Sequence, residues 1–431
     1  MYYSTNHQSA ALGLKEAVFK SLADDEGLFM PEYIPSLPNQ FFKDIQTLTL
    51  QEIAFEVSRC LLHNEITDSK LRRVVEEAIT FEAPLVPIYK GIHALELFHG
   101  PTMAFKDFGA RFMARLVSVL REDEDQNLCI LVATSGDTGS AVASGFLGVK
   151  GVEVKILYPS GKVSTLQEQQ LTTSGQNITA IEVQGSFDDC QRMVKQAFLD
   201  SEINIKLHLT SANSINIARL IPQSFYYFHA YSQLKYLKKD IVISVPSGNF
   251  GNLTAGLIAK KMGLPIHKFI AATNINSVVP EFLETGIFKS RPSKMTISNA
   301  MDVGNPSNFS RILELYGHHK NDISNDIIGY SFTDIETQEA MKRIYQDTGY
   351  IMDPHGAVGY LGIEKHIKTQ TGNIEGIFLE TAHPAKFKNI VDKTLDLDIP
   401  IPDTLMDCMR KEKKAKQIEN DYEELKKVLL G

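Results

Sequence analysis

The stretch "IVISVPSGNFGNLTAGLIAKKMG", residues 241–263, decides the fold because it holds a strand, a turn and a helix in succession. The apolar run 241–245 predicts a buried strand, and 253–263 has the pattern of a helix that ends at Gly263. The turn between them, residues 248–252, brings backbone N–H groups to the start of that helix. Such a unit is typical of a parallel sheet covered by helices.

The same order of elements occurs elsewhere in the chain. "NLCILVA" at 127–133 predicts a strand, "TSGDTG" at 134–139 a turn, and "SAVASGFLGVKG" at 140–151 a helix. Thr333 and Glu336 form the T-x-x-E pattern of a capping box, which predicts a helix start. Further strands are predicted at 152–159, 178–183, 269–273 and 374–380. This alternation predicts an α/β fold with two open, mainly parallel sheets and helices on both faces.

The length and the changes of pattern predict four parts. A chain of 431 residues exceeds the usual size of a single hydrophobic core. Residues 1–92 repeat apolar residues at spacings of three and four, which favours a largely helical N-terminal segment. We expect a smaller α/β domain at 93–216, a larger one at 217–400, and a charged helical tail at 401–431.

Composition favours a folded protein in the cytoplasm. Hydrophobic residues make up 43% of the chain, charged residues 22%, and the net charge is −8. No apolar run approaches the roughly 20 residues of a membrane-spanning helix, and the N-terminus does not resemble a signal peptide. The four cysteines lie far apart in apolar stretches, so we expect reduced thiols and neither a metal site nor disulfides. Without a long basic block, nucleic acid is not an expected partner.

The 248–252 turn is a candidate anion site. Gly248 and Gly251 permit close approach of a ligand, and Asn249 and Asn252 can donate hydrogen bonds from beside Phe250. The turn matches neither the dinucleotide pattern G-x-G-x-x-G nor the Walker pattern, so a nucleotide is not the first expectation. A sharp turn without a ligand is the alternative interpretation.

The 134–139 turn repeats this arrangement, with hydroxyls and amides that could bind a carboxylate. Two such turns suggest a ligand with several anionic groups, or two anionic ligands that meet in one cleft. Further candidates for anion binding follow strand ends, although each could equally be an ordinary surface or loop residue. The candidates of this second group are Thr134, Ser135, Asp137, Thr138, Lys162, Asn213, Asn216 and Arg219.

A lysine in the segment "HGPTMAFKDFG", residues 99–109, suggests the chemistry. Lys106 follows a Gly-Pro turn and stands among Met103, Phe105 and Phe108, so partial desolvation would lower its pKa and suit it to Schiff-base formation. A reactive lysine combined with a phosphate-binding turn that lacks a Walker lysine favours pyridoxal phosphate. Thr381, just after a predicted strand, is placed to face the pyridine nitrogen.

The chain resembles the threonine synthase family, of the longer bacterial and fungal type. The motifs are "HGPTMAFKDFG", "ATSGDTGSA", "NSINIARLIPQ", "PSGNFGN", "DVGNPSNF", "DPHGAVG" and "ETAHPAKF", together with the N-terminal segment. The resemblance covers nearly the whole chain. It implies the tryptophan-synthase-β type of fold, known as fold type II, and conversion of O-phosphohomoserine and water to threonine and phosphate.

By position, the resemblance implies that Lys106 holds the cofactor and transfers protons, that 248–252 binds the cofactor phosphate, and that Thr381 faces the pyridine nitrogen. In related members the loop matching 134–139 holds the substrate carboxylate, and the substrate phosphate is expected near Asn213, Asn216 and Arg219, with Lys162 a weaker candidate. A phospholyase that yields 2-oxobutyrate, or an inactive relative that binds a phosphorylated metabolite, is the alternative. We expect a monomer or a homodimer.

Overall fold

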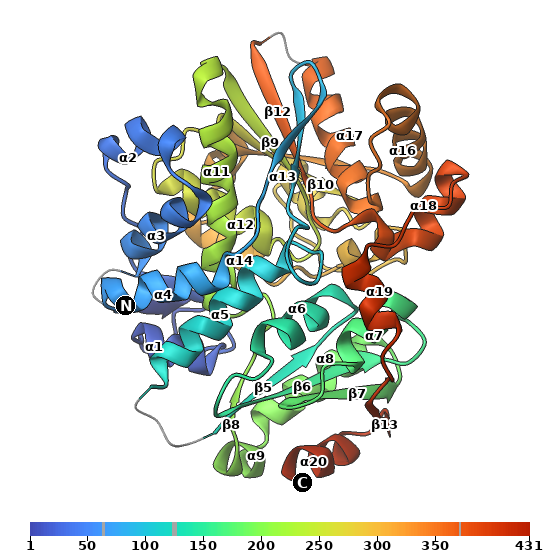
Figure 1. The fold of residues 1–431 in the computed structure, drawn as a ribbon. Coiled ribbons are helices and arrows are strands. Elements are labelled where there is room, and N and C mark those ends of the chain that lie inside the picture. Colours follow the sequence, from blue (N-terminus) through green and yellow to red (C-terminus); the bar gives the residue numbers. More distant parts are fainter. Residues whose placement is uncertain (63–64, 123–126, 370–371) are drawn as a thin grey trace.

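The structure, a computed structural model, describes residues 1–62, 65–122, 127–369 and 372–431. Two sheets of mainly parallel strands form the two halves of the molecule, and helices cover both (Figure 1). The predicted α/β class with two open sheets is therefore confirmed, as is the succession of strand, turn and helix in both glycine-rich units.

The larger sheet has six strands in the order β11-β10-β9-β12-β4-β3, and all neighbouring pairs are parallel except β3 and β4. The central strands β9 and β12 are buried on both faces, which explains their continuous apolar runs. The strands are β3 (Leu85–Tyr89), β4 (Ile92–Glu96), β9 (Asp240–Pro246), β10 (Lys268–Thr273), β11 (Ile327–Ser331) and β12 (Ile374–Glu380).

The smaller sheet is parallel throughout, in the order β13-β7-β6-β5-β8. Its strands are β5 (Leu128–Ala133), β6 (Val152–Pro159), β7 (Ile178–Gln184), β8 (His208–Thr210) and β13 (Ala415–Glu419). A separate antiparallel pair joins β1 (Tyr2–Ser4) to β2 (Phe29–Pro31) within the N-terminal segment.

Sheet membership differs from the sequence-based division at two places. Residues 93–96 of strand β4 fall within the predicted smaller domain. In the structure β4 pairs with β12 in the larger sheet, because the β3–β4 hairpin folds back onto that sheet. The tail 401–431, predicted as helical, contains strand β13, which pairs with β7 at the edge of the smaller sheet. Only Ile418 of β13 is buried, so its sequence gave no apolar run to indicate a strand.

Helices pack on both faces of the sheets; α17, for example, lies against β9, β10 and β12. The α-helices are α1 (Leu14–Lys20), α2 (Asn39–Asp44), α3 (Leu50–Leu61), α4 (Asp68–Ala78), α5 (Lys106–Leu120), α6 (Asp137–Phe146), α7 (Thr165–Thr172), α8 (Phe187–Leu199), α9 (Ser201–Lys206), α10 (Ile217–Leu220), α11 (Phe225–Leu234), α12 (Gly251–Lys261), α13 (Val278–Thr285), α14 (Phe309–Leu315), α15 (Lys320–Asp326), α16 (Asp334–Thr348), α17 (Pro354–Thr369), α18 (Lys388–Leu395), α19 (Asp403–Met409) and α20 (Tyr422–Leu430). Short 3₁₀ helices lie at Ile45–Thr47, Ile221–Ser224, Lys235–Leu237, Asn299–Met301 and Pro384–Phe387.

Aromatic packing fixes helix α5, which begins at Lys106. Phe108 meets Tyr226 edge to face, with ring centroids 5.1 Å apart, and Phe112 meets Phe225 in the same way at 5.6 Å. These fully buried rings join α5 to α11, so the N-terminus of α5 has a defined position. Phe108 thus belongs to the core between α5 and α11.

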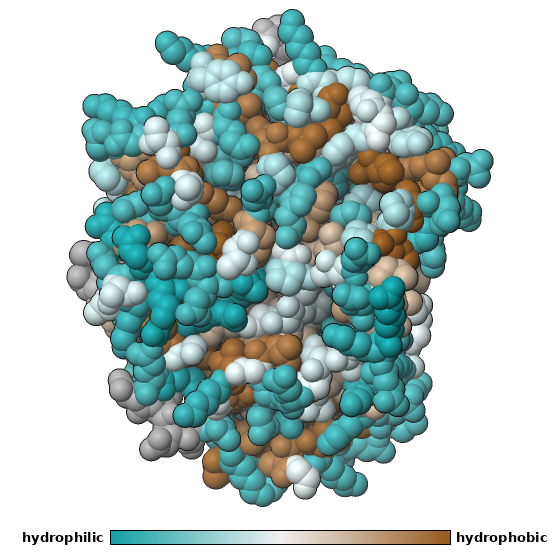
Figure 2. Space-filling view, viewed as in Figure 1, coloured by the Kyte–Doolittle hydropathy of each residue, from teal (hydrophilic) through white to brown (hydrophobic). Residues whose placement is uncertain are grey.

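The capping box predicted at α16 is confirmed: the amide of Glu336 donates to Thr333 Oγ1 at 3.3 Å, and Glu336 Oε2 accepts from the Thr333 amide at 2.7 Å. The surface is mixed, and Figure 2 shows hydrophilic residues over most of the viewed face with hydrophobic residues in separate patches. Within the described ranges, no helix has the length and apolar character needed to cross a membrane.

Candidate active site

Lys106 lies at the first position of α5, directly after a turn that a buried carboxylate holds. Asp107 accepts hydrogen bonds from the Thr102 amide at 2.8 Å and from Thr102 Oγ1 at 2.7 Å. A side chain at Gly100 would place its Cβ only 2.5 Å from Asp107 Oδ2, so glycine is required there. Asp107 therefore fixes the turn that presents the lysine, a role that sequence analysis did not identify.

The Lys106 amine lies between polar and aromatic neighbours. Its Nζ is 3.8 Å from Asp137 Oδ2 and 5.0 Å from the centroid of the Phe105 ring, and its side chain is 19% exposed. Burial lowers the pKa of Lys106, the charge of Asp137 raises it, and the nearby cations Lys386 and Arg219 lower it. The side chain is thus only partly exposed, and burial disfavours the protonated form of its amine, which suits Schiff-base formation.

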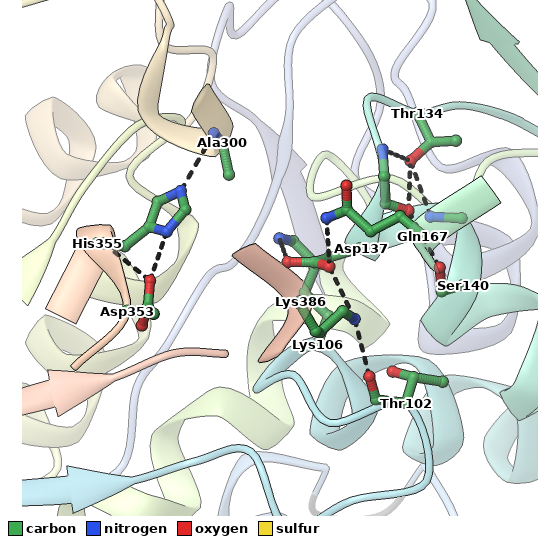
Figure 3. Close-up of polar contacts among 12 residues, drawn as sticks. Thr102, Lys106, Thr134, Asp137, Ser140, Gln167, Ala300, Asp353, His355 and Lys386 are labelled. Atoms are coloured by element: carbon green, nitrogen blue, oxygen red, sulfur yellow. Dashed lines mark hydrogen bonds and ion pairs between the residues drawn. The ribbon is translucent and has the colours of Figure 1, made fainter. Parts of the chain in front are cut away.

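A second lysine, Lys386, shares the same carboxylate. Its Nζ donates to Asp137 Oδ1 and to the Thr102 carbonyl, each at 2.8 Å, and its side chain is fully buried. Asp137 also accepts from Gln167 Nε2 at 2.8 Å. Burial by itself would raise the pKa of Asp137, but Lys386 and Lys106 hold it below its ordinary value. Figure 3 shows this cluster, with Asp137 between the two lysines and Gln167.

The 134–139 turn is built by one hydroxyl. Thr134 Oγ1 accepts from the amides of Gly136 at 3.0 Å and Gly139 at 2.9 Å, so the predicted candidate Thr134 organises the turn from a buried position. Ser135 and Thr138 are partly exposed at the start of α6, where a ligand could meet their hydroxyls. The turn thus combines accessible donors with a helix N-terminus.

The 248–252 turn connects β9 to α12 in the shape that the sequence predicted. Phe250 has a left-handed backbone, φ 63°, and precedes Gly251, the first residue of α12. At Gly248 a Cβ would lie 2.7 Å from the Cα of Met301 and 2.8 Å from the carbonyl oxygen of Ala300. The turn therefore packs tightly on the segment around Ala300, and its helix N-terminus presents amides that have no partner within the helix.

The asparagines of this turn differ in what they can offer a ligand. Asn249 donates to Ser214 Oγ at 2.6 Å and to Ser307 Oγ at 2.9 Å, so its amide holds two hydroxyls beside the turn. Asn252 Oδ1 accepts from the hydroxyls of Tyr226 and Tyr227, each at 2.6 Å. These two bonds fix which end of the amide is oxygen. The buried Nδ2 of Asn252, at the other end, has no acceptor among the described residues. An orphaned donor beside a helix N-terminus fits a phosphate.

Thr381 is brought next to Lys106 by backbone bonds beyond the end of β12. The Thr381 carbonyl accepts from the Phe105 amide at 2.9 Å, and the His383 amide donates to the Met103 carbonyl at 3.0 Å. Thr381 is buried, with 7% of its surface exposed. The predicted lysine and threonine thus lie on two segments that run side by side.

A buried group of acids and a histidine, absent from the sequence-based candidates, lies between β12 and α17. Asp353 Oδ1 is 2.6 Å from His355 Nδ1, and His355 Nε2 accepts from the Ala300 amide at 3.2 Å, which assigns the proton to Nδ1 (Figure 3). Burial together with Asp353 raises the pKa of Glu380 well above its ordinary value. A Cβ at Gly356 would lie 2.1 Å from Glu380 Oε1, so this group is closely packed. It supports the Ala300 segment against which the 248–252 turn lies.

The remaining candidates fall into different environments. Asn213 Nδ2 donates to the Ala133 carbonyl at 2.9 Å, next to the 134–139 turn. The amide of Asn216 is occupied, since its Nδ2 donates to the carbonyls of Val18 and Ser211 and its Oδ1 caps α10. Lys162 is exposed in the turn after β6.

Arg219 is buried beside α5. Its guanidinium donates to the Ala212 carbonyl, while its buried Nε has no acceptor among the described residues. Burial lowers the pKa of Arg219 to about 10. A Cβ at Gly109 would lie 2.8 Å from this Nε, so the guanidinium packs directly on the helix that begins with Lys106.

Comparisons with known families identify the kind of protein. A model described as "Pyridoxal-phosphate dependent enzyme" matches residues 86–377, and models of the threonine synthase N terminus and C-terminal region match 1–79 and 356–429. Threonine synthase of Haemophilus influenzae is 44% identical over 99% of both chains, and that of Saccharomyces cerevisiae is 37% identical over 99% of this chain and 96% of its own.

Solved structures give the same result. The crystal structure of threonine synthase from Escherichia coli is 39% identical, with a TM-score of 0.92 and coverage of 100% of this chain and 99% of that one. A threonine synthase from Brucella melitensis with bound pyridoxal phosphate is 33% identical, with a TM-score of 0.93 and coverage of 100% and 98%. Matches of this extent, together with the lysine and the two turns, place the chain in the threonine synthase family of pyridoxal-phosphate-dependent enzymes.

Proposed function

We propose that this site converts O-phosphohomoserine and water to threonine and inorganic phosphate. The observation that carries the proposal is the partly exposed Lys106 side chain, whose amine lies 3.8 Å from Asp137 and whose neighbour Phe105 is joined through its backbone to Thr381. When bound, pyridoxal phosphate supplies a carbonyl that forms a Schiff base with an amine and a ring that stabilises negative charge at the substrate carbons. The other tasks fall to side chains and amides of the chain itself.

The binding roles follow from the two turns. We assign the cofactor phosphate to the 248–252 turn, the pyridine nitrogen to Thr381, and the substrate carboxylate to the 134–139 turn. A neutral hydroxyl opposite the nitrogen would not enforce a protonated ring. For the substrate phosphate, Arg219 is favoured, because its buried Nε has no acceptor among the described residues. Asn213, whose Nδ2 donates to the Ala133 carbonyl beside the 134–139 turn, is a further candidate for its position. The occupied amide of Asn216 and the exposed position of Lys162 make those two weaker candidates.

Lys106 is the proposed proton carrier. The Lys106 amine, at the start of α5, would take the proton from Cα of the bound substrate and return it to Cα at the end of the reaction. The proton lost from Cβ would balance the one gained at Cγ as phosphate departs. Water would supply the hydroxyl at Cβ, and its remaining proton would leave with the phosphate. Asp137 places a negative charge 3.8 Å from the Lys106 amine, and Lys386 holds Asp137 in position through an ion pair. Because water must enter late, the two halves of the molecule are expected to close on the substrate.

The test is product analysis combined with replacement of Lys106. Wild-type enzyme with O-phosphohomoserine should release phosphate and threonine in equal amounts, with little 2-oxobutyrate. Lys106→Ala should lose both the visible absorbance of the bound cofactor and the activity, whereas Lys90→Ala, at an exposed turn, should keep both. A normal spectrum in Lys106→Ala would overturn the lysine assignment, and 2-oxobutyrate as the main product would overturn the reaction.

We also infer a cytoplasmic enzyme, either monomer or homodimer, that does not bind nucleic acid. The net charge of −8 and the short, acid-interrupted basic run near the C-terminus argue against nucleic-acid binding. We retain the division into an N-terminal segment, a smaller and a larger α/β domain and a C-terminal tail, with β4 and β13 assigned to the sheets that they join.

A further inference from the structure

A fully buried arginine lies behind the 248–252 turn. Arg311 of α14 donates to the carbonyls of Phe29, Ser214 and Ile215 at 2.6 to 3.2 Å, and through Nη1 to Asn308 Oδ1 at 2.7 Å. None of the carboxylates in the described part of the chain forms an ion pair with it. A guanidinium sealed from water and surrounded only by neutral acceptors leaves its positive charge without a counterion.

Asn308 lies between Arg311 and the 248–252 turn. Its side chain is fully buried, and the bond from Arg311 fixes which end of the amide is oxygen. Its Nδ2 therefore points away from Arg311 and has no acceptor within the described residues. A Cβ built on Gly251 would lie 3.4 Å from this Nδ2, so the donor without a partner lies beside the first residue of α12.

Two buried amide donors without a partner among the described residues thus belong to the surroundings of one helix N-terminus, Asn252 as the second residue of α12 and Asn308 packed beside its first. Asn252 Nδ2 and Asn308 Nδ2 are each fixed by bonds to the opposite end of their amide, from tyrosine hydroxyls in one case and from Arg311 in the other. Buried polar groups in proteins are almost always paired, so two unpartnered donors at one helix N-terminus favour a ligand rich in acceptors. The guanidinium behind Asn308 further indicates that the ligand is an anion, since it polarises the amide toward donation.

We propose that Asn308 is a further ligand of the cofactor phosphate and that Arg311 is the positioning residue that orients it and supplies the positive charge behind it. The inference rests on the proposed assignment of the 248–252 turn to that phosphate. It adds to the turn a donor from a segment 56 residues further along the chain, counted from Asn252 to Asn308.

The test uses Asn308→Asp, which keeps the size of the side chain and should pair with Arg311, so the protein is expected to fold. Dissociation constants of the apoenzyme are measured for pyridoxal phosphate and for pyridoxal, which lacks the phosphate. We expect the variant to bind pyridoxal phosphate at least tenfold more weakly, as for loss of a hydrogen bond to a charged group, and pyridoxal unchanged. Inorganic phosphate should raise the melting temperature of wild-type apoenzyme more than that of the variant.

Arg311→Lys tests the positioning role, because lysine keeps the charge but loses the planar fork that holds Asn308. Arg311→Lys should lower the affinity for pyridoxal phosphate relative to that for pyridoxal. In the Asn308→Asp background it should cause no further change in this ratio. An unchanged ratio in Asn308→Asp would overturn the proposal. Additive effects of the two substitutions would show that Arg311 does not act through Asn308. Wild-type apoenzyme that binds pyridoxal phosphate no better than pyridoxal would instead overturn the assignment of the turn, and this inference with it.

Discussion

Replacing Lys386 with methionine tests whether the buried pair of Lys386 and Asp137 organises the active site. The substitution keeps most of the side-chain volume and removes the cation that lies 2.8 Å from Asp137 Oδ1. Removing one partner of a buried ion pair costs about 3–5 kcal/mol, because the other charge stays buried. In the apoenzyme Lys106 remains 3.8 Å from the same carboxylate, so we expect the lower end, about 3 kcal/mol.

The cost should rise when the cofactor binds. If Lys106 is then bound to the cofactor, Lys386 would be the remaining lysine amine that pairs with Asp137. If Lys386→Met costs about 1.4 kcal/mol more in the loaded enzyme than in the apoenzyme, linkage requires about tenfold weaker cofactor binding. Urea unfolding of the apoenzyme measures the first quantity, and titration with pyridoxal phosphate measures the second.

Asp137→Asn provides the matched control. In the Lys386→Met background it removes the uncompensated carboxylate while it keeps an oxygen that can accept from Gln167. The double variant should therefore regain about 2 kcal/mol of the lost stability. Equal stability of the single and double variants, or a loss below about 1 kcal/mol in the single variant, would refute the reasoning from the buried pair.

Two further predictions concern the walls of the site. Gly248→Ala should weaken cofactor binding at least tenfold in a fluorescence titration, because the new Cβ would lie 2.7 Å from the Cα of Met301; unchanged affinity would contradict this close approach. Burial lowers the pKa of His383 to about 4. The imidazole therefore takes up a proton at a higher pH in the unfolded chain than in the folded one. The free energy of unfolding should fall by about 1–2 kcal/mol as the pH falls from 7 to 5. His383→Asn, which can still accept from the Ala385 amide, should show a smaller loss in urea unfolding over this interval, and an equal loss would speak against the histidine.

Sequence patterns predicted what lies close together along the chain. Each glycine-rich turn follows its own strand and precedes its own helix, so residues 241–263 contain nearly all the information needed to place the 248–252 turn. The same holds for Lys106, whose Gly-Pro turn and helix are adjacent in sequence. Local steric and capping rules are sufficient for such units.

What sequence analysis missed depends on partners distant in the chain. Lys386 meets Asp137, and Arg311 meets the carbonyl of Phe29, across separations that no periodicity encodes. The sequence around Lys386 could have indicated a buried lysine. Lys386 stands between alanine and phenylalanine shortly after a buried strand, and Lys106 likewise has an aromatic neighbour. The edge strand β13 was missed because a short, charged strand owes its conformation to the sheet that it joins.

The distribution of charge explains how an acidic protein can hold two phosphorylated molecules. A net charge of −8 repels anions at long range, so binding must come from local groups whose charge is not screened by water. Arg219 and Arg311 are such groups, since each is buried and neither forms an ion pair with a carboxylate in the described residues. Arg219 packs on the helix that begins with Lys106, and Arg311 lies behind the 248–252 turn. Each arginine thus provides a positive charge without an ion pair near where one of the two phosphates is assigned. Lys386, paired with Asp137, instead fixes the surroundings of Lys106.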